Sequence, residues 1–395
     1  MADNKDKKVL NVPALRFPEF TDEWKEVLFA SNLERLENGA TYNTNDKDGV
    51  PMSRIETIST GRIDYTKVGH CSTPQKIEHY IMRYGDILFS HINSLKHIGK
   101  TAYYSAEEPL YHGMNLLLFR CKNNVDSKFF FFLINNTHFI RKCQILAKQA
   151  VNQASISTSD LKKIKVYIPD INEQSKIQKF LSLIEKRIEL QNKIIEDLKK
   201  LKSALADKLY SSTKGETFSF RQLFDVVNER NKKLTYSNVL SASQELGMIE
   251  RSDINIDIKF EQDSISKYKI VRRGDYVVHL RSFQGGFAFS DRTGICSPAY
   301  TILRPHDMVV YGYLSYFFTS KPFIKSLKLV TYGIRDGRSI NVEEWLDMTV
   351  TLPTKREQSH ILAIINAIDN KLHNENQIHN YMFRQRTYLL KTMFI

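Results

Sequence analysis

The chain has 395 residues, more than a single hydrophobic core usually serves, so at least two domains are expected. Hydrophobic residues make up 42% of it and aromatic residues 11%, which excludes a wholly disordered chain. The formal net charge of +13 favours a polyanionic partner, most simply nucleic acid, although a basic protein can also be merely soluble.

The cysteine spacing and the short apolar runs argue against zinc-binding, secreted and membrane-spanning proteins. None of the four cysteines forms a CxxC pair or lies near histidine at zinc-finger spacing, so we expect no metal site and free thiols in a reducing compartment. The amino-terminal MADNKDKK has no apolar stretch behind it, unlike a secretory signal. The longest apolar run, residues 129–134, is far too short to cross a bilayer. A cytoplasmic protein is therefore expected.

Residues 15–169 predict a first globular domain. The run DILFS (86–90) is typical of a strand, and a turn at Gly85 precedes it. The aromatic stretch SKFFFFLINN (127–136) predicts a helix. A polar, basic loop, AKQAVNQAS (147–155), is expected near the end of the domain.

A long helix is predicted over residues 170–213. Pro169 prevents an earlier start, and Asp170 with Glu173 forms a capping box. Apolar residues then recur at heptad spacing: Ile177, Phe180, Leu181, Ile184, Ile188, Ile194, Ile195, Leu198, Leu201 and Leu205. About 40 residues at a rise of 1.5 Å make a helix roughly 60 Å long.

The second half repeats the first. SISTSDLKKIKVYIPDINEQSKI (155–177) aligns without a gap with SINVEEWLDMTVTLPTKREQSHI (339–361). Arg120 and Arg304 are separated by the same offset as Ser155 and Ser339, and a strand DYVVHL, after a turn at Gly274, resembles DILFS. The scaffold therefore recurs.

The segments between the repeated parts differ. Residues 41–90 and residues 228–279 share little, although equivalent scaffold surrounds them. Equal scaffolds with unequal inserts suggest two sites that do the same job on different targets.

A second capped helix closes the repeat, with Thr354 and Glu357 as its capping box. Because a long amphipathic helix needs a partner for its apolar stripe, the two helices are expected to pack together; the alternative is that each docks separately on a domain. The expected fold class is α+β, with two similar globular domains, two long antiparallel coiled-coil helices and a pseudo-two-fold repeat. The expected divisions are residues 15–169, 170–213, 214–353 and 354–395.

Motifs for catalysis are weak. GKT (99–101) has Ser94 where a phosphate-binding loop needs glycine. Two acidic-x-Lys triplets, at 23–25 and 257–259, are of a kind that arises by chance in so charged a chain. We found no S-adenosylmethionine loop, no amino-methylation motif and no histidine beside a nucleophile. The sequence predicts a binding protein, not an enzyme.

The candidate DNA-binding residues lie in two polar segments of each half. Arginine can bond guanine edges, glutamine and asparagine can bond adenine, and lysine can neutralise phosphate. The candidates are His91, Asn93, Lys96, Lys100, Gln149, Asn152 and Gln153 in the first half, and Arg281, Ser282, Gln284, Arg292, Tyr332, Arg335 and Arg338 in the second. For each, the alternative is an ordinary solvated side chain.

Four segments resemble one known family, the specificity subunit of Type I restriction–modification systems. They are LRFPEFTDEWKEVLF (15–29), GDILFSHINSLKHIGK (85–100), IPDINEQSKI (168–177) and LPTKREQSHI (352–361). The resemblance runs from about Leu15 to the carboxyl terminus, and the order and duplication of the segments are more specific than any one of them.

The resemblance implies a non-catalytic subunit that binds double-stranded DNA. Each half would be a target recognition domain for one part of a split, asymmetric sequence, and the helices would set the gap. Partners would be two modification (methyltransferase) subunits and, in some complexes, two restriction (translocase and nuclease) subunits. S-adenosylmethionine, ATP and Mg would belong to those partners, with no cofactor on this chain.

Apolar residues left over on the helices are candidate docking surface for the partner subunits, or else coiled-coil core. They are Ile195, Leu209, Tyr388 and Met393. A rival interpretation of the whole chain is a solitary DNA-binding or anti-restriction protein that binds DNA or the methyltransferase without supporting modification. The DNA target itself is not readable from these residues.

Overall fold

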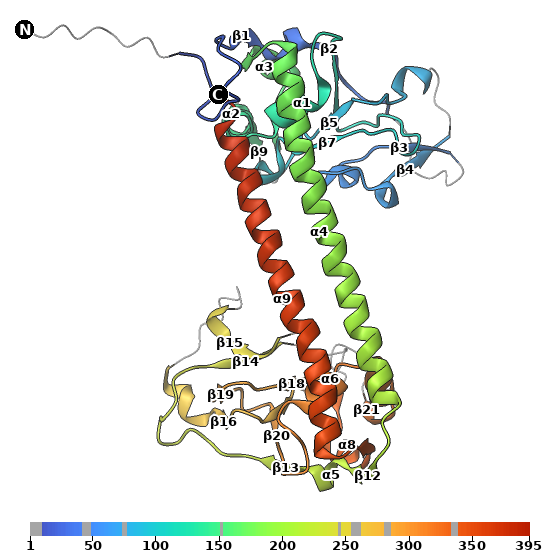
Figure 1. The fold of residues 1–395 in the computed structure, drawn as a ribbon, viewed down its shortest axis with the longest axis vertical. Coiled ribbons are helices and arrows are strands. Elements are labelled where there is room, and N and C mark those ends of the chain that lie inside the picture. The colour runs from blue at the N-terminus through green and yellow to red at the C-terminus, as the bar shows by residue number, and fades with distance from the viewer. Residues whose placement is uncertain are drawn as a thin grey trace, which may run out of the picture. The chain divides into compact units, whose positions relative to one another are not determined.

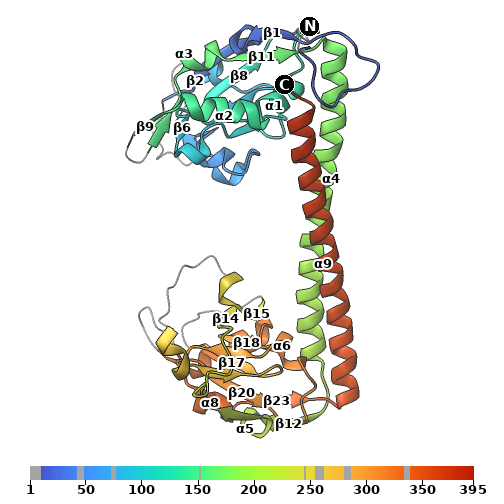
Figure 2. The ribbon, with the colours of Figure 1, turned by 90° about the vertical axis from the view of Figure 1, so that its left-hand side faces the viewer.

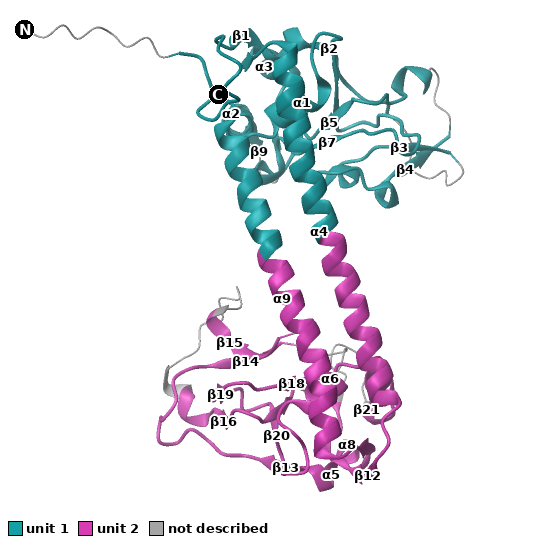
Figure 3. Cartoon of the chain, viewed as in Figure 1, with its two compact units in different colours: residues 1–191, 378–395 teal, residues 192–377 magenta. Residues whose placement is uncertain are grey.

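The computed structural model describes residues 10–41, 49–72, 77–150, 153–243, 246–253, 262–279, 286–332 and 339–395. It divides the chain into two compact units of mixed helix and strand (Figure 3). Unit 1 is residues 1–191 with 378–395, and unit 2 is residues 192–377. Each long helix is shared between the units. Within the described ranges, no helix is both long and apolar enough to cross a membrane.

Unit 1 is built on a four-stranded antiparallel sheet (Figure 1). In sheet order its strands are β2 (Leu33–Asn38), β8 (Leu117–Cys121), β5 (Ile87–Phe89) and β7 (Thr101–Tyr103). The expected strand at 86–90 is thus confirmed as β5, which lies inside the sheet with Leu88 opposite Leu118 and Ala102. Such a central strand is buried on both faces, which explains its unbroken apolar run.

Smaller elements complete unit 1. The helices are α1 (Ser127–Ile134), α2 (Thr137–Leu146) and α3 (Thr158–Lys163); the further strands are β1 (Lys25–Leu28) paired with β11 (Lys165–Ile168), β3 (Val50–Met52) paired with β4 (Gly69–Cys71), and β6 (Ile92–Asn93), β9 (Lys148–Ala150) and β10 (Gln153–Ser155) in a three-stranded sheet. The aromatic stretch predicted as a helix is confirmed as α1, and Asp126 caps it by accepting hydrogen bonds from the amides of Lys128 and Phe129.

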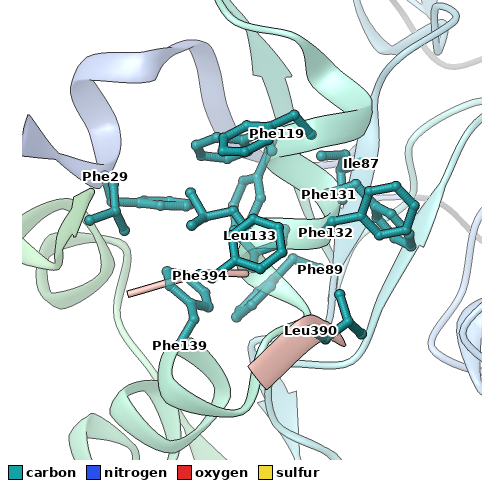
Figure 4. Packing of buried hydrophobic residues seen from close by; sticks show 14 of the residues in the cluster. Phe29, Ile87, Phe89, Phe119, Phe131, Phe132, Leu133, Phe139, Leu390 and Phe394 are labelled. Atoms are coloured by element: carbon teal, nitrogen blue, oxygen red, sulfur yellow. The ribbon is translucent and has the colours of Figure 1, made fainter. Parts of the chain in front are cut away.

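The core of unit 1 is rich in phenylalanine (Figure 4). The Phe29 ring centroid lies 5.2 Å from those of Phe119 and Phe139, and all three side chains are buried. Leu390 and Phe394, from the end of the chain, pack into the same cluster. Since burial of one such side chain stabilises the fold by roughly 1.5–3 kcal/mol, the last turn of the chain is an integral part of unit 1.

Unit 2 repeats this sheet in the order β13 (Phe224–Val227), β20 (Thr301–Pro305), β17 (Tyr276–Val278) and β18 (Phe287–Phe289). Its other elements are helices α5 (Phe220–Leu223), α6 (Tyr313–Phe317), α7 (Lys321–Ser326) and α8 (Val342–Asp347), and the strand pairs β12 (Glu216–Ser219) with β23 (Thr349–Leu352), β14 (Leu240–Ser243) with β15 (Gly247–Glu250), β16 (Lys269–Val271) with β19 (Gly294–Cys296), and β21 (Thr331–Tyr332) with β22 (Ser339–Ile340). Trp345 stacks on Phe220 at 4.3 Å in its core.

The two long helices are α4 (Ile171–Ser211) and α9 (Lys355–Thr392). In unit 1 the beginning of α4, including Ile177 and Leu181, shares a core with Leu389 near the end of α9. In unit 2 the end of α4 and the beginning of α9 share a core that includes Ala206 and Ile365. Each helix is therefore anchored to both units.

The capping boxes differ between the repeats. In α9 the expected box is confirmed, because the Thr354 hydroxyl accepts from the Glu357 amide and the Glu357 carboxylate accepts from the Thr354 amide. In α4, Asp170 caps the helix, but Glu173 does not reach back. Instead Arg16 donates two hydrogen bonds of 2.7 Å to the fully buried Glu173 carboxylate. Arg16, which is not part of the local motif, therefore binds the carboxylate that would otherwise complete the capping box.

Candidate nucleic-acid interface

The two polar segments predicted for the first half meet in one small sheet. Residues 147–155 were expected to be a loop, but the structure contradicts this: β9 and β10 form an antiparallel hairpin there. The hairpin pairs with β6, so that Ala154 lies opposite both Gln149 and Asn93. The polar side chains suggested a loop, but they alternate with a buried one as in a strand: Gln153 and Ser155 face solvent, and Ala154 between them is buried.

Unit 2 carries a hairpin at the equivalent place. β21 pairs with β22, with Tyr332 opposite Ser339. Ser155 and Ser339 head the two aligned repeats, so the hairpins occupy the same position in each domain. Arg335 and Arg338 lie in the connection between β21 and β22, outside the described residues.

Exposed polar residues gather along the hairpin sheet of unit 1. Gln149, Gln153 and Lys96 are exposed. Asn93 is half-buried, and its amide is already engaged with the Ser90 hydroxyl at 3.3 Å and the Ser94 amide at 2.8 Å. The Lys100 ammonium donates to the Ser59 carbonyl at 2.8 Å. The glutamines and Lys96 are therefore better placed to bind a ligand than Asn93 and Lys100.

His91 does not fit the expected role of a surface contact. Its side chain is only 6% exposed, and the Ile156 amide donates to its carbonyl. Burial lowers the pKa of His91 to about 4, so the ring is uncharged at neutral pH and offers no cation to a phosphate. Its Nδ1 has no hydrogen-bond partner among the described residues. Nothing in the sequence indicated this burial, because a polar residue at a strand end is ordinarily exposed.

The candidates of the second half are largely outside the described part of the chain. Arg281, Ser282, Gln284 and, in the first half, Asn152 belong to this group. Tyr332 is described only through its place in β21. Arg292 is partly exposed, and its guanidinium donates to the neighbouring Asp291 carboxylate at 2.8 Å, which also lowers the pKa of Asp291. Its positive charge is therefore partly compensated.

A buried ion pair holds the strand that leads to this sheet in unit 1. Asp86, 1% exposed, accepts hydrogen bonds from Arg120 at 2.8 and 2.7 Å and from the Arg83 amide at 2.7 Å. The bonds to Asp86 raise the pKa of Arg120. Gly85 before it has φ of 92°, the left-handed region that favours glycine, so the turn presents the carboxylate to the arginine.

Unit 2 has an equivalent ion pair between an aspartate and an arginine. Asp275 accepts from Arg304 at 3.0 Å twice and from the Arg272 amide at 2.8 Å, after Gly274 with φ of 99°. The sequence shows the repeated arginines and Gly-Asp turns separately. That they form a pair was missed, because the two arginines keep the offset of the aligned repeats whereas the two aspartates lie slightly farther apart.

The candidate docking residues on the helices lie in different environments. Met393 is 2% exposed and Ile195 is 7% exposed, so both side chains are taken up by packing within the chain. Leu209 is partly buried against the unit 2 core. Tyr388, at 60% exposed, is the member of the set that offers surface to a partner.

Comparison with known proteins finds relatives of about half of the chain. Residues 22–200 match the model described as Type I restriction modification DNA specificity domain. The putative type I restriction enzyme MjaX specificity subunit of Methanocaldococcus jannaschii is 42% identical over 211 residues, 52% of this chain and 49% of that protein. Over these residues the chain is similar to the DNA specificity domain of Type I restriction–modification systems. The MjaVIII specificity subunit of the same organism is 23% identical over 205 residues, 48% of this chain and 46% of that protein.

The chain thus spans about half the length of the curated relatives it matches. Solved structures share its fold more widely. The S subunit of a Type I system from M. genitalium covers 97% of this chain and 99% of its own, with a TM-score of 0.54 at 15% identity. A chain from a study of complex assembly and conformational transition of the type I R-M system covers 93% and 96%, with a TM-score of 0.58 at 13% identity. Specificity subunits are in general non-catalytic, and the solitary or anti-restriction interpretation is not favoured.

Proposed function

We propose that this chain is a specificity subunit, which directs a Type I restriction–modification complex to an asymmetric, two-part DNA sequence in the cytoplasm. Each unit reads one half of the target. The observation that carries the proposal is the pair of hairpins, β9–β10 and β21–β22, on matching scaffolds. Their polar side chains differ between the units, so the two half-sites differ as well.

The long helices set the gap between the half-sites. In this proposal α4 and α9 form an antiparallel pair that acts as a ruler, as dimer geometry does in other DNA-binding proteins. Two polar contacts at the repeat spacing support the pairing. Arg386 bonds Glu185 at 3.0 Å within unit 1, and Lys202 bonds Asp369 at 2.5 Å within unit 2.

The chemistry is supplied by partner subunits. Two methyltransferase subunits, with S-adenosylmethionine, modify one adenine in each half-site, and two restriction subunits with ATP and Mg join in complexes that cleave DNA. No group of three or more metal-ligating side chains occurs among the described residues. Exposed apolar side chains on the helices in unit 1 provide docking surface: Leu183, Leu190, Tyr381, Phe383 and Tyr388.

The decisive experiment is to co-express this chain with its neighbouring methyltransferase subunit in a methylation-free host and to map methyladenine by single-molecule sequencing. The expected result is a split motif with two dissimilar halves around a fixed gap. A stable complex without any methylated DNA motif would contradict the proposal and favour the interpretation as a solitary DNA-binding protein.

A domain exchange tests the assignment of halves. Replacing residues 228–338 by the equivalent region of a relative should change one half-site and leave the other intact, because residues 15–169 are untouched. If both halves of the motif changed together, the two-module reading of DNA would be wrong.

Deleting seven residues, one heptad, within 184–205 should shorten the gap or abolish assembly.

A further inference from the structure

Two large apolar side chains stand out by their exposure. Leu329 is 76% exposed and Ile145 is 73% exposed, the highest values among the large hydrophobic side chains of the described residues. They are separated by the same offset as Ser155 and Ser339, which is the spacing of the internal repeat. A single exposed leucine or isoleucine is ordinary, but the same exposure at the same place in two divergent domains is not explained by chance placement.

The surrounding residues show that the two positions are structurally equivalent. In unit 1, Phe139 and Cys143 of α2 point into the core. Their counterparts in unit 2, Phe323 and Leu327, are buried as well. The register is therefore identical. In unit 1 the neighbouring Leu146 is also exposed, at 40%, but Ile145 is the position that recurs in unit 2.

Both side chains lie in a basic setting. Arg141 is exposed one helical turn before Ile145, and Lys325 is exposed one turn before Leu329. Lys148, also exposed, follows Ile145 at the start of β9. An apolar side chain flanked by cations suits a polyanion that also offers apolar surface, which is the chemistry of DNA with its phosphates outside and its bases in the grooves.

Each side chain also adjoins a hairpin of the proposed DNA interface. Ile145 is in the last turn of α2, which runs directly into β9 (Figure 2). Leu329 is in the short 3-10 helix η8 (Leu327–Val330), and β21 begins at the next residue. The apolar side chain therefore lies immediately before the hairpin along the chain in each unit.

We propose that Ile145 and Leu329 are DNA-contacting residues, each pressing against base edges or a base step beside its hairpin while Arg141 and Lys325 bind the adjacent phosphates. This inference rests on the proposed function and adds an apolar contact to the polar ones. Apolar side chains contact thymine methyl groups or enter between base pairs as wedges, and a wedge bends the duplex.

The test uses the full-length chain with its methyltransferase subunit and a duplex carrying the mapped motif. Ile145→Ser and Leu329→Ser should each lower DNA affinity roughly 10- to 100-fold, because each removes one buried apolar contact. The dependence of affinity on salt should stay that of the wild type. Arg141→Ala should instead reduce the salt slope by about one, since it removes a phosphate contact.

The matched control is Leu201→Ser, which removes a side chain that is 48% exposed on α4, outside the proposed docking surface. It should leave DNA affinity unchanged, and all variants should unfold at the wild-type temperature because the altered side chains are exposed. Substituting 2-aminopurine at each base step should locate a wild-type fluorescence change that the matching serine variant loses.

The outcomes separate the two proposals. If the wild-type complex binds no duplex in preference to another, the proposed function falls. If it binds specifically and both serine variants bind as tightly, the inference about Ile145 and Leu329 is overturned. If the serine variants instead lose the methyltransferase subunit during purification, the exposed side chains belong to a protein contact, and the inference is equally overturned.

Discussion

Unit 1 and unit 2 share equivalent internal hydrogen bonds, although parts of their sequences differ. Asn136 and Ser320 cap equivalent helices, and Gln174 and Gln358 make equivalent bonds from the long helices to their domains. Residues 41–90 and 228–279 share little sequence, although each range ends in a strand of the shared four-stranded sheet, β5 or β17. The shared framework places a hairpin at the same position in each unit, whereas the side chains on the two hairpins differ.

The units differ in how the framework is closed at its amino-terminal edge. In unit 1 the segment before β1 fastens to α4, where Arg16 bonds Glu173 and the Phe17 ring packs edge-on against Phe180 at 5.8 Å. The Leu15 amide donates to the Thr392 carbonyl at the end of α9. In unit 2 the corresponding glutamate, Glu357, serves its own helix cap. Unit 1 therefore has an additional fastening that holds both helices.

The largest difference between the units should appear when the buried ion pairs are broken. Asp86→Ala leaves Arg120, whose side chain is 9% exposed, without its carboxylate, whereas Asp275→Ala leaves Arg304, which is 33% exposed. An unpaired buried charge costs about 3–5 kcal/mol, so Asp86→Ala should destabilise unit 1 by roughly this amount. Asp275→Ala should cost unit 2 less, because water reaches Arg304.

The chain provides its own probes for this measurement. It has two tryptophans, Trp24 buried in unit 1 and Trp345 buried in unit 2. Urea unfolding followed by fluorescence in Trp345→Phe and Trp24→Phe backgrounds should report each unit separately. Equal losses of unfolding free energy in the two units would show that the greater burial of Arg120 has no energetic consequence.

Acid should weaken unit 1 more than unit 2. Burial lowers the pKa of His112 to about 4, against about 6.5 for an exposed histidine. Between these values the unfolded chain binds a proton that the folded chain excludes, so stability is full above pH 6.5 and falls as the pH drops toward 4. His91 has the same sign. The loss for His112 alone is up to about 3 kcal/mol.

Unit 2 has opposing histidines. Burial lowers the pKa of His279, but a hydrogen bond to Asp225 raises the pKa of His306, whose contribution is present below pH 6.5 and lost as the pH rises through the raised value. The measurement is the midpoint of urea unfolding between pH 7 and pH 4.5, with His112→Gln as the control that should flatten the unit 1 curve. A steeper fall in unit 2 would contradict this assignment.

Much of this framework could be predicted from the sequence, because local patterns encode it. The strand at 86–90, the helix at 127–136 and the cap of α9 follow from neighbouring residues alone. The partner of Glu173 could not be predicted, since Arg16 lies 157 residues away and no local pattern links the two.

In the candidate site, too, local patterns could be predicted from the sequence and long-range pairing could not. Sequence marked the segments around Gln149 and Asn93 separately, and only the pairing of β6 with β10 brings them into one sheet. The burial of His91, which is 6% exposed, was likewise not encoded in the neighbouring residues. The exposed Ile145 and Leu329 were missed because an apolar residue in a helix is ordinarily assigned to the core. Their separation by the offset of the aligned repeats was the available signal.

A smaller difference is expected from the buried glutamines that join each long helix to its domain. Gln358 donates to the carbonyls of Met308 and Pro353 at 2.9 Å and accepts from the Val310 amide at 2.8 Å. Gln174 makes two such bonds, to the Pro169 carbonyl and from the Asp126 amide. Leucine has a similar volume but cannot satisfy these groups.

Gln358→Leu should therefore cost unit 2 roughly 3 kcal/mol and Gln174→Leu should cost unit 1 roughly 2 kcal/mol, since each buried unpaired group costs about 1–3 kcal/mol. The two tryptophan probes measure both variants, with Gln377→Leu on the exposed part of α9 as the control. A larger loss for Gln174→Leu would reverse the order that the hydrogen bonds of the two glutamines predict.

The smallest effects should come from the ion pairs between the long helices, which also compare the units most directly. Glu185 with Arg386 in unit 1 and Asp369 with Lys202 in unit 2 occupy equivalent positions. All four side chains are about one quarter to one third exposed, so solvent screens them, and double-mutant cycles to alanine should give couplings of about 0.5–1 kcal/mol. Arginine presents a planar fork and lysine a point charge, so the unit 1 coupling should be the larger at high salt. Coupling near zero in both units would show that apolar packing alone holds the helices, and that the repeated charges serve their register instead.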